Sequence, residues 1–67
     1  MAGALEAMEQ RLREELRAVR ETRLALERLG MLTLERAVEL EREQARIRRL
    51  LYELEKAKQE EGASGGG

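Results

Sequence analysis

One glycine constrains the fold of this chain more than any other residue. Gly30 is the only glycine between residues 4 and 61, and the sequence of 67 residues contains no proline. The stretches on either side consist mainly of Glu, Arg, Leu, Ala and Gln, which are strong helix formers. Because glycine readily adopts the left-handed conformation that ends a helix, Gly30 predicts a break between two long helices.

The residues after Gly30 carry the signals of a new helix. Thr33 can cap its N-terminus, and Glu35 brings a negative charge to its first turn, where the helix dipole favours one. Leu32 precedes the cap and is placed to pack on Ala37. A continuous rod needs no cap, so adjacent stop and start signals favour a chain that reverses its direction here.

The sequence therefore predicts an antiparallel hairpin within residues 1–61. We expect a first helix over about residues 4–29, a turn over 30–33 and a second helix over about 34–60. The residues 62–67, GASGGG, have nothing to bury and predict a disordered tail. Charged residues make up 40% of the chain and aromatic residues 1%, a composition typical of a coiled coil or long helix. The predicted fold class is all-α.

Apolar residues recur at helical spacing in both segments and predict the seam between the helices. If the chain reverses near residues 31 and 32, residues whose numbers sum to about 63 face each other, and most apolar positions then meet apolar partners. The polar Gln44 and Thr22 either form a buried layer that fixes the register or lie at the edge of the seam with their polar ends in water. The predicted seam consists of Leu5, Met8, Leu12, Leu16, Val19, Leu26, Leu29, Ala37, Leu40, Gln44, Ile47, Leu51 and Leu54.

A second apolar column lies about 100° round the second helix from its seam. One seam rarely stabilises two arms of this length, and an exposed apolar surface of this extent usually marks an interface. The alternative is that these residues are scattered over an ordinary surface. The predicted interface consists of Leu24, Leu34, Val38, Ala45 and Tyr52. We expect two hairpins to pair into a four-helix bundle, or one hairpin to dock on another helical protein.

The sequence offers few groups for catalysis or metal binding. It contains no His, Asp or Cys, which removes most nucleophile–base pairs and most transition-metal sites. We therefore expect a non-enzymatic structural or interaction module without cofactor, metal or small-molecule substrate. A net charge of −1, the absence of a long apolar run and the absence of a signal peptide favour a cytoplasmic protein without membrane contact.

Two columns of arginine are the feature that would suit a nucleic-acid-binding protein. They consist of Arg13, Arg17 and Arg20 in the first helix and Arg42, Arg46 and Arg49 in the second. The hairpin register puts both columns at the same level, and on a common face they would form a strip for phosphate groups. Aromatic residues for base stacking are missing and glutamates lie close by, so solvated faces of mixed charge are the competing interpretation.

In its length, its single turn and its apolar stripes the chain resembles the Rop family of plasmid RNA-binding proteins, which are helical hairpins that dimerise into four-helix bundles. This resemblance implies RNA binding. The segment from Gly30 to Ala37 resembles the turn and second helix of the exonuclease VII small subunit, although the aromatic residue and glycine found further along that helix are missing here. In size and hairpin form the chain is also similar to small co-chaperones of type III secretion, which implies an accessory role. The helix-forming composition suits both a thermophile and a designed sequence.

Overall fold

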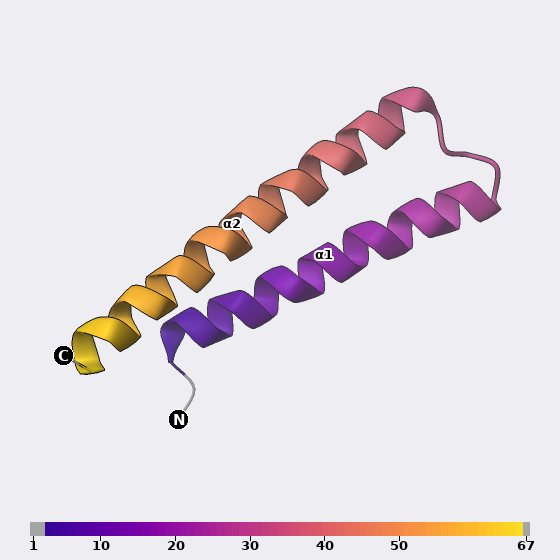
Figure 1. Cartoon of the computed structure of the whole chain (residues 1–67). Helices are drawn as coiled ribbons and strands as arrows, with labels where there is room; N and C mark the ends of the chain where they lie inside the picture. The colour runs from indigo at the N-terminus through magenta and orange to yellow at the C-terminus, as the bar shows by residue number, and fades with distance from the viewer. Residues whose placement is uncertain (1–2, 67) are drawn as a thin grey trace.

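The computed structural model describes the backbone of residues 3–66 and the side chains of residues 3–60. Within these limits the chain forms two helices that run antiparallel and side by side (Figure 1). α1 spans Ala4–Arg28 and α2 spans Leu34–Gly66. The all-α helical hairpin predicted from the sequence is confirmed. We call the end opposite the turn, where α1 begins and α2 ends, the open end.

Gly30 occupies the turn with φ of 68°, in the left-handed region. Its amide donates to the carbonyl of Glu27 at 3.1 Å, and the amide of Met31 donates to the carbonyl of Leu26 at 2.8 Å. These two bonds form a Schellman motif, which satisfies the last carbonyl groups of α1. A Cβ atom at Gly30 would meet nothing within 4 Å, so the backbone conformation alone accounts for the glycine.

Thr33 caps the N-terminus of α2. Its Oγ1 accepts a hydrogen bond from the amide of Arg36 at 3.1 Å, and its carbonyl accepts one from the amide of Ala37 at 2.9 Å. Glu35 lies in the first turn of the helix. The C-terminal end of α1 and the N-terminal end of α2 therefore both depend on hydrogen bonds made within five residues of the turn.

The C-terminal end of α2 lies further along the chain than the sequence predicts. The helix continues to Gly66, whereas the expected helix ends near residue 60 and the expected disordered tail covers residues 62–67. Each residue added to an existing helix gains a backbone hydrogen bond, so a helix can extend through residues that would not start one. Gly67 and the side chains from residue 61 onward lie outside the described part of the chain.

The hairpin is a thin rod of 54 × 21 × 12 Å. Its smallest dimension equals the diameter of about one helix with its side chains. The radius of gyration is 15.8 Å, whereas a compact domain of this length has one of about 11 Å. Each helix meets one other helix, and most of its circumference faces solvent.

The least exposed side chains form one stripe on each helix, in alternating steps of four and three residues. The stripe of α1 consists of Leu5, Glu9, Leu12, Leu16, Val19, Arg23 and Leu26. The stripe of α2 consists of Ala37, Leu40, Gln44, Ile47, Leu51, Leu54 and Lys58, with Ala57 beside it. Among the described side chains only Ile47 and Leu54 are buried, with 1% and 8% of their surface exposed. The other stripe residues are half-buried.

Two of the residues that the sequence assigns to the seam lie outside these stripes. Met8 and Leu29 are 53% and 70% exposed. Glu9 occupies the stripe position on α1, so Met8 points about 100° to one side, and Leu29 follows α1 as its C-cap. Gln44 is half-buried and Thr22 is exposed, so within one chain they do not form a buried polar layer.

Candidate interaction faces

A small apolar groove lies on one side of the hairpin, near the open end. It has a volume of about 300 Å³ and is lined by Met8, Arg11, Leu12, Leu50, Glu53, Leu54 and Ala57. The groove lies where the predicted register places Met8 beside Leu54 and Ala57. We call this side of the hairpin the groove face.

The second apolar column lies on the other side of the hairpin. Val38, Ala45 and Tyr52 each follow a stripe residue of α2, whereas Leu50 and Ala57 each precede one. Because successive residues of a helix are about 100° apart, the two sets flank the stripe on opposite sides. We call this second side the column face. On α2 it consists of Leu34, Val38, Glu41, Ala45, Arg48, Tyr52 and Glu55, again in steps of four and three.

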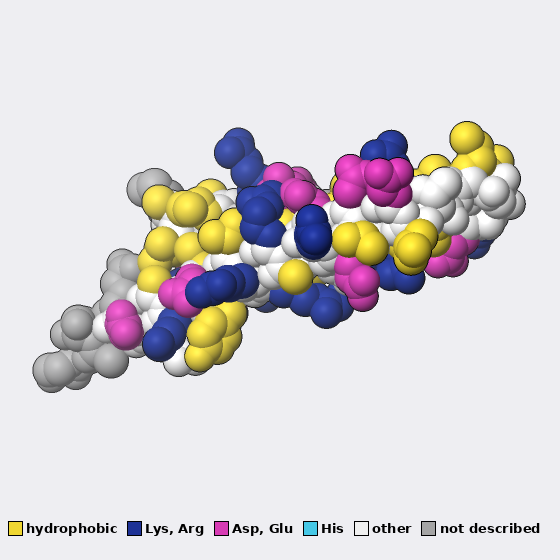
Figure 2. All heavy atoms as spheres, turned by 90° about the horizontal axis from the view of Figure 1, so that it is seen from above, with side chains coloured by type: hydrophobic (Ala, Val, Ile, Leu, Met, Phe, Trp, Pro, Cys, Tyr) yellow, Lys and Arg dark blue, Asp and Glu magenta, His cyan; other side chains and the backbone are white. Residues whose placement is uncertain are grey.

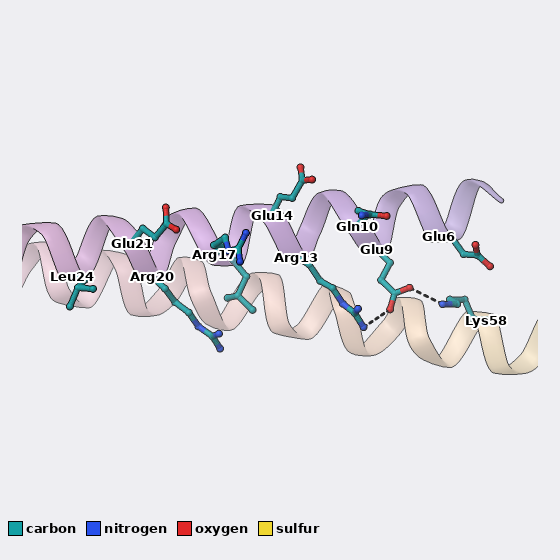
Figure 3. A pocket seen from close by; sticks show the side chains of 11 residues that line it. Glu6, Glu9, Gln10, Arg13, Glu14, Arg17, Arg20, Glu21, Leu24 and Lys58 are labelled. Atoms are coloured by element: carbon teal, nitrogen blue, oxygen red, sulfur yellow. Dashed lines mark hydrogen bonds and ion pairs between the residues drawn. The ribbon is translucent and has the colours of Figure 1, made fainter. Parts of the chain in front are cut away.

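On α1 the column face is a shallow groove with charged walls (Figure 3). Its lining consists of Glu6, Glu9, Gln10, Arg13, Glu14, Leu16, Arg17, Arg20, Glu21 and Leu24 of α1 and Lys58 of α2. In Figure 3 Arg13 and Arg20 extend toward α2, whereas Glu14 and Glu21 point away from it. We refer to Arg13, Arg17 and Arg20 together as the α1 arginines.

All five residues of the predicted interface are exposed in the single chain. Leu34 is 83% exposed, Tyr52 64%, Leu24 46% and Val38 39%. On the side seen in Figure 2, apolar side chains reach the surface at both ends of the molecule, and most of the basic and acidic side chains lie between them. The hairpin therefore leaves large apolar side chains in water that its own seam does not cover.

Glu9 joins the two helices at the open end (Figure 3). Its Oε1 accepts a hydrogen bond from Lys58 Nζ at 2.7 Å, and its Oε2 accepts one from Arg13 Nη2 at 2.8 Å. The Glu9 side chain is 13% exposed and that of Lys58 31%. The hydrogen bond from Lys58 lowers the pKa of Glu9, and the charge of Arg13 lowers it further; the same hydrogen bond raises the pKa of Lys58.

Sequence reasoning did not find this pair. The signal that could have found it is the spacing, because Glu9 continues the four-and-three steps of α1 and Lys58 continues those of α2. A carboxylate and an ammonium group at matching ends of two facing stripes are complementary charges.

The structure does not bring the two predicted arginine columns into one groove. The α1 arginines line the groove on the column face, and its lining includes none of Arg42, Arg46 and Arg49. Arg46 instead forms an ion pair with Glu43, which raises its pKa, and the charge of Glu15 on α1 adds to this shift. Glu15 precedes a stripe residue and so lies on the groove face. The groove of the α1 arginines also has four glutamates in its lining, so its charge is mixed.

Over the described part of the chain, no three acidic side chains come together as ligands for a metal ion. Within residues 3–66, neither helix has an apolar stretch of the length that a bilayer crossing requires.

No protein-family model matches this chain, and no curated protein or solved structure matches it. The resemblances to known families in length, turn and apolar stripes are therefore not supported by a match to any of these families.

Proposed function

We propose that this chain is a non-enzymatic interaction module, a helical hairpin that self-associates through its column face. The observation that carries this proposal is the contrast between a thin seam and a large exposed apolar surface. Among the described side chains the seam buries only Ile47 and Leu54, while Leu34 and Tyr52 remain largely in water and Leu24 is almost half exposed. A core of this size gives little stability to a chain of this length, so further helices are needed to cover the column face.

The accessible surface supports a partner of substantial size. The chain exposes 5664 Å², whereas a compact monomer of this mass exposes about 4,300 Å². Part of the excess belongs to the end of α2, which has 33 residues against 25 in α1. With that overhang included, the excess of about 1,300 Å² is of the same order as the roughly 800 Å² that each partner contributes to a standard interface. One docked hairpin would remove a surface of this order from water.

A second copy of the chain is the partner that we propose. Two hairpins that cover each other form a four-helix bundle, in which every helix packs against two neighbours instead of one. Pairing of identical chains by a twofold axis is the commonest form of oligomer. The apolar residues of the column face would then form a shared core between the two seams.

The test is to place charges in the column. Val38→Glu combined with Tyr52→Glu should preserve the helices, because Glu is a better helix former than either residue. Interface cores are depleted of charge, so the double variant should not associate. We expect the mass of a dimer for the parent by light scattering, and an unfolding midpoint that rises with protein concentration. The double variant should have the mass of a monomer and a lower midpoint that does not depend on concentration.

Leu50→Glu is the matched control, because Leu50 is 41% exposed and Val38 39%, but on opposite faces. We expect this variant to keep the mass of the dimer. A parent that is monomeric at every concentration contradicts self-association. Dissociation by Leu50→Glu, with the double variant still dimeric, would move the interface to the groove face. A parent that is monomeric alone but binds another helical protein through Val38 and Tyr52 would replace the second copy by that partner.

A further inference from the structure

We propose that the two copies pack with their turns at the same end of the assembly. This orientation rests on the self-association proposed above and specifies its geometry. A twofold axis parallel to the rod produces it and lays α1 of one copy on α2 of the other. A twofold axis perpendicular to the rod would put the turns at opposite ends and lay each helix on its own copy. In both arrangements the helices that meet across the interface are antiparallel. The two arrangements differ in which residues of the column face lie against each other.

The column face is apolar near the turn and polar near the open end. Near the turn it carries Leu24, Leu34 and Val38, with exposed fractions of 46%, 83% and 39%. Near the open end it carries Glu6 on α1 and Glu55 on α2. With the turns at the same end, the apolar residues of both copies meet in one cluster. With the turns at opposite ends, they would lie against the glutamates of the other copy, whose charges would lose water without gaining a partner.

The α1 arginines lie between the polar open end and Leu24 (Figure 3). Laying α1 on its own copy would bring these three cations against the same three of the partner, and like charges that face each other oppose association. Laying α1 on α2 instead places them at the level of Ala45, Arg48 and Tyr52, so that one like charge faces them in place of three. The ring of Tyr52 can take a guanidinium group on its face.

Spin-label distances between the two chains test this orientation. The chain contains no cysteine, so a single introduced cysteine carries one label per chain. Met31→Cys places the label in the turn, where Met31 is 62% exposed, and Ala7→Cys places it on an exposed position near the open end. Light scattering on the labelled variants verifies that they have the mass of the parent dimer.

With the turns at the same end, each variant should give a label-to-label distance below about 30 Å, as expected across a bundle with helix axes 8–10 Å apart. With the turns at opposite ends, each distance should reach about 38 Å or more, the length of a 25-residue helix. Mixing the two variants gives dimers with one chain of each kind. In these dimers the label at residue 31 of one chain lies close to the label at residue 7 of the other only when the turns lie at opposite ends.

Short distances in the single variants and a long one in the mixture are the expected result. The reverse pattern in a protein with the mass of a dimer overturns the orientation and leaves self-association intact. A monomeric mass without any distance between chains overturns the proposed function, and the orientation with it.

Discussion

Lys58 of α2 reaches across the seam to Glu9 of α1, with Nζ 2.7 Å from Oε1. Both residues occupy stripe positions at which an apolar side chain would be expected. They lie at the open end of the hairpin, far from the covalent link that the turn provides. The pair therefore holds the two arms in register at the place where the turn constrains them least.

Glu9→Gln should make the free energy of unfolding depend less on pH in the acid range. Because the hydrogen bond from Lys58 lowers the pKa of Glu9 below its ordinary value of 4.5, the carboxylate stabilises the hairpin fully above that value. This contribution is lost as the pH falls through the lowered pKa. The raised pKa of Lys58 has the opposite consequence, since its contribution is present below its ordinary value of 10.5 and is lost as the pH rises through the raised value.

Urea unfolding of the parent and of Glu9→Gln at a series of pH values measures this effect. Below pH 4.5 the parent should lose stability more steeply than Glu9→Gln, and above it the parent should be the more stable of the two. Glu14→Gln is the control, because Glu14 is exposed and points away from α2 (Figure 3); it should keep the acid limb of the parent. An acid limb in Glu9→Gln as steep as that of the parent would show that the pair does not contribute.

The hairpin could be derived from the sequence because its determinants are local. Gly30 and Thr33 act through backbone groups no more than five residues away. The strong helix formers on either side of the turn make both flanking segments helical. Such short-range effects are visible in a sequence without knowledge of the fold.

The rotation of each helix about its axis was harder to derive. Between Leu5 and Leu12, hydropathy selects Met8 for the seam, whereas the structure places Glu9 there. Both residues satisfy a step of three or four, and the partner that favours Glu9 is Lys58, which is 49 residues away. The two arginine columns illustrate the same difficulty, because the register fixes their level along the rod but not the side to which they point.

Gly30→Val should destabilise the hairpin by about 1–2 kcal/mol, the strain of placing a side chain in the left-handed region. A Cβ atom there would meet nothing within 4 Å, so the loss comes from the backbone conformation and not from crowding at Cβ. Gly30→Asn is the control, because asparagine tolerates positive φ better than a β-branched residue. Urea unfolding should rank the parent first, Gly30→Asn second and Gly30→Val last. Equal stability of Gly30→Val and the parent would mean that the turn does not require positive φ at this position.

Truncation of leucine to alanine at a buried and at a half-buried position of the seam should measure how tightly each position is packed. Leu54 is 8% exposed, and Leu54→Ala should cost about 2–5 kcal/mol per chain in the free energy of unfolding. Leu16 is only half-buried, so Leu16→Ala should cost less. Denaturant titrations at one protein concentration compare the two variants. A larger loss at Leu16 would show that the surroundings of these residues in solution differ from those in the hairpin.

Leu24 and Leu50 form a matched pair for the proposed assembly. They have the same side chain and are 46% and 41% exposed in the single chain, but Leu24 lies on the column face and Leu50 on the groove face. If a second copy covers the column face, truncation of Leu24 removes apolar area that the dimer buries, whereas truncation of Leu50 does not. Since full burial of a leucine side chain contributes about 1.5–3 kcal/mol, half of it gives a difference of about 1 kcal/mol.

We therefore expect Leu24→Ala to be about 1 kcal/mol per chain less stable than Leu50→Ala at concentrations where the parent is dimeric. Dilution should remove the difference, because the two residues are equally exposed once the copies separate. Denaturant unfolding at two protein concentrations, one above and one below dissociation of the parent, provides the four values needed. If the difference in stability between the two variants remains after dilution, it arises within the single hairpin and not from its assembly. If Leu50→Ala loses more stability than Leu24→Ala at high concentration, the second copy lies on the groove face.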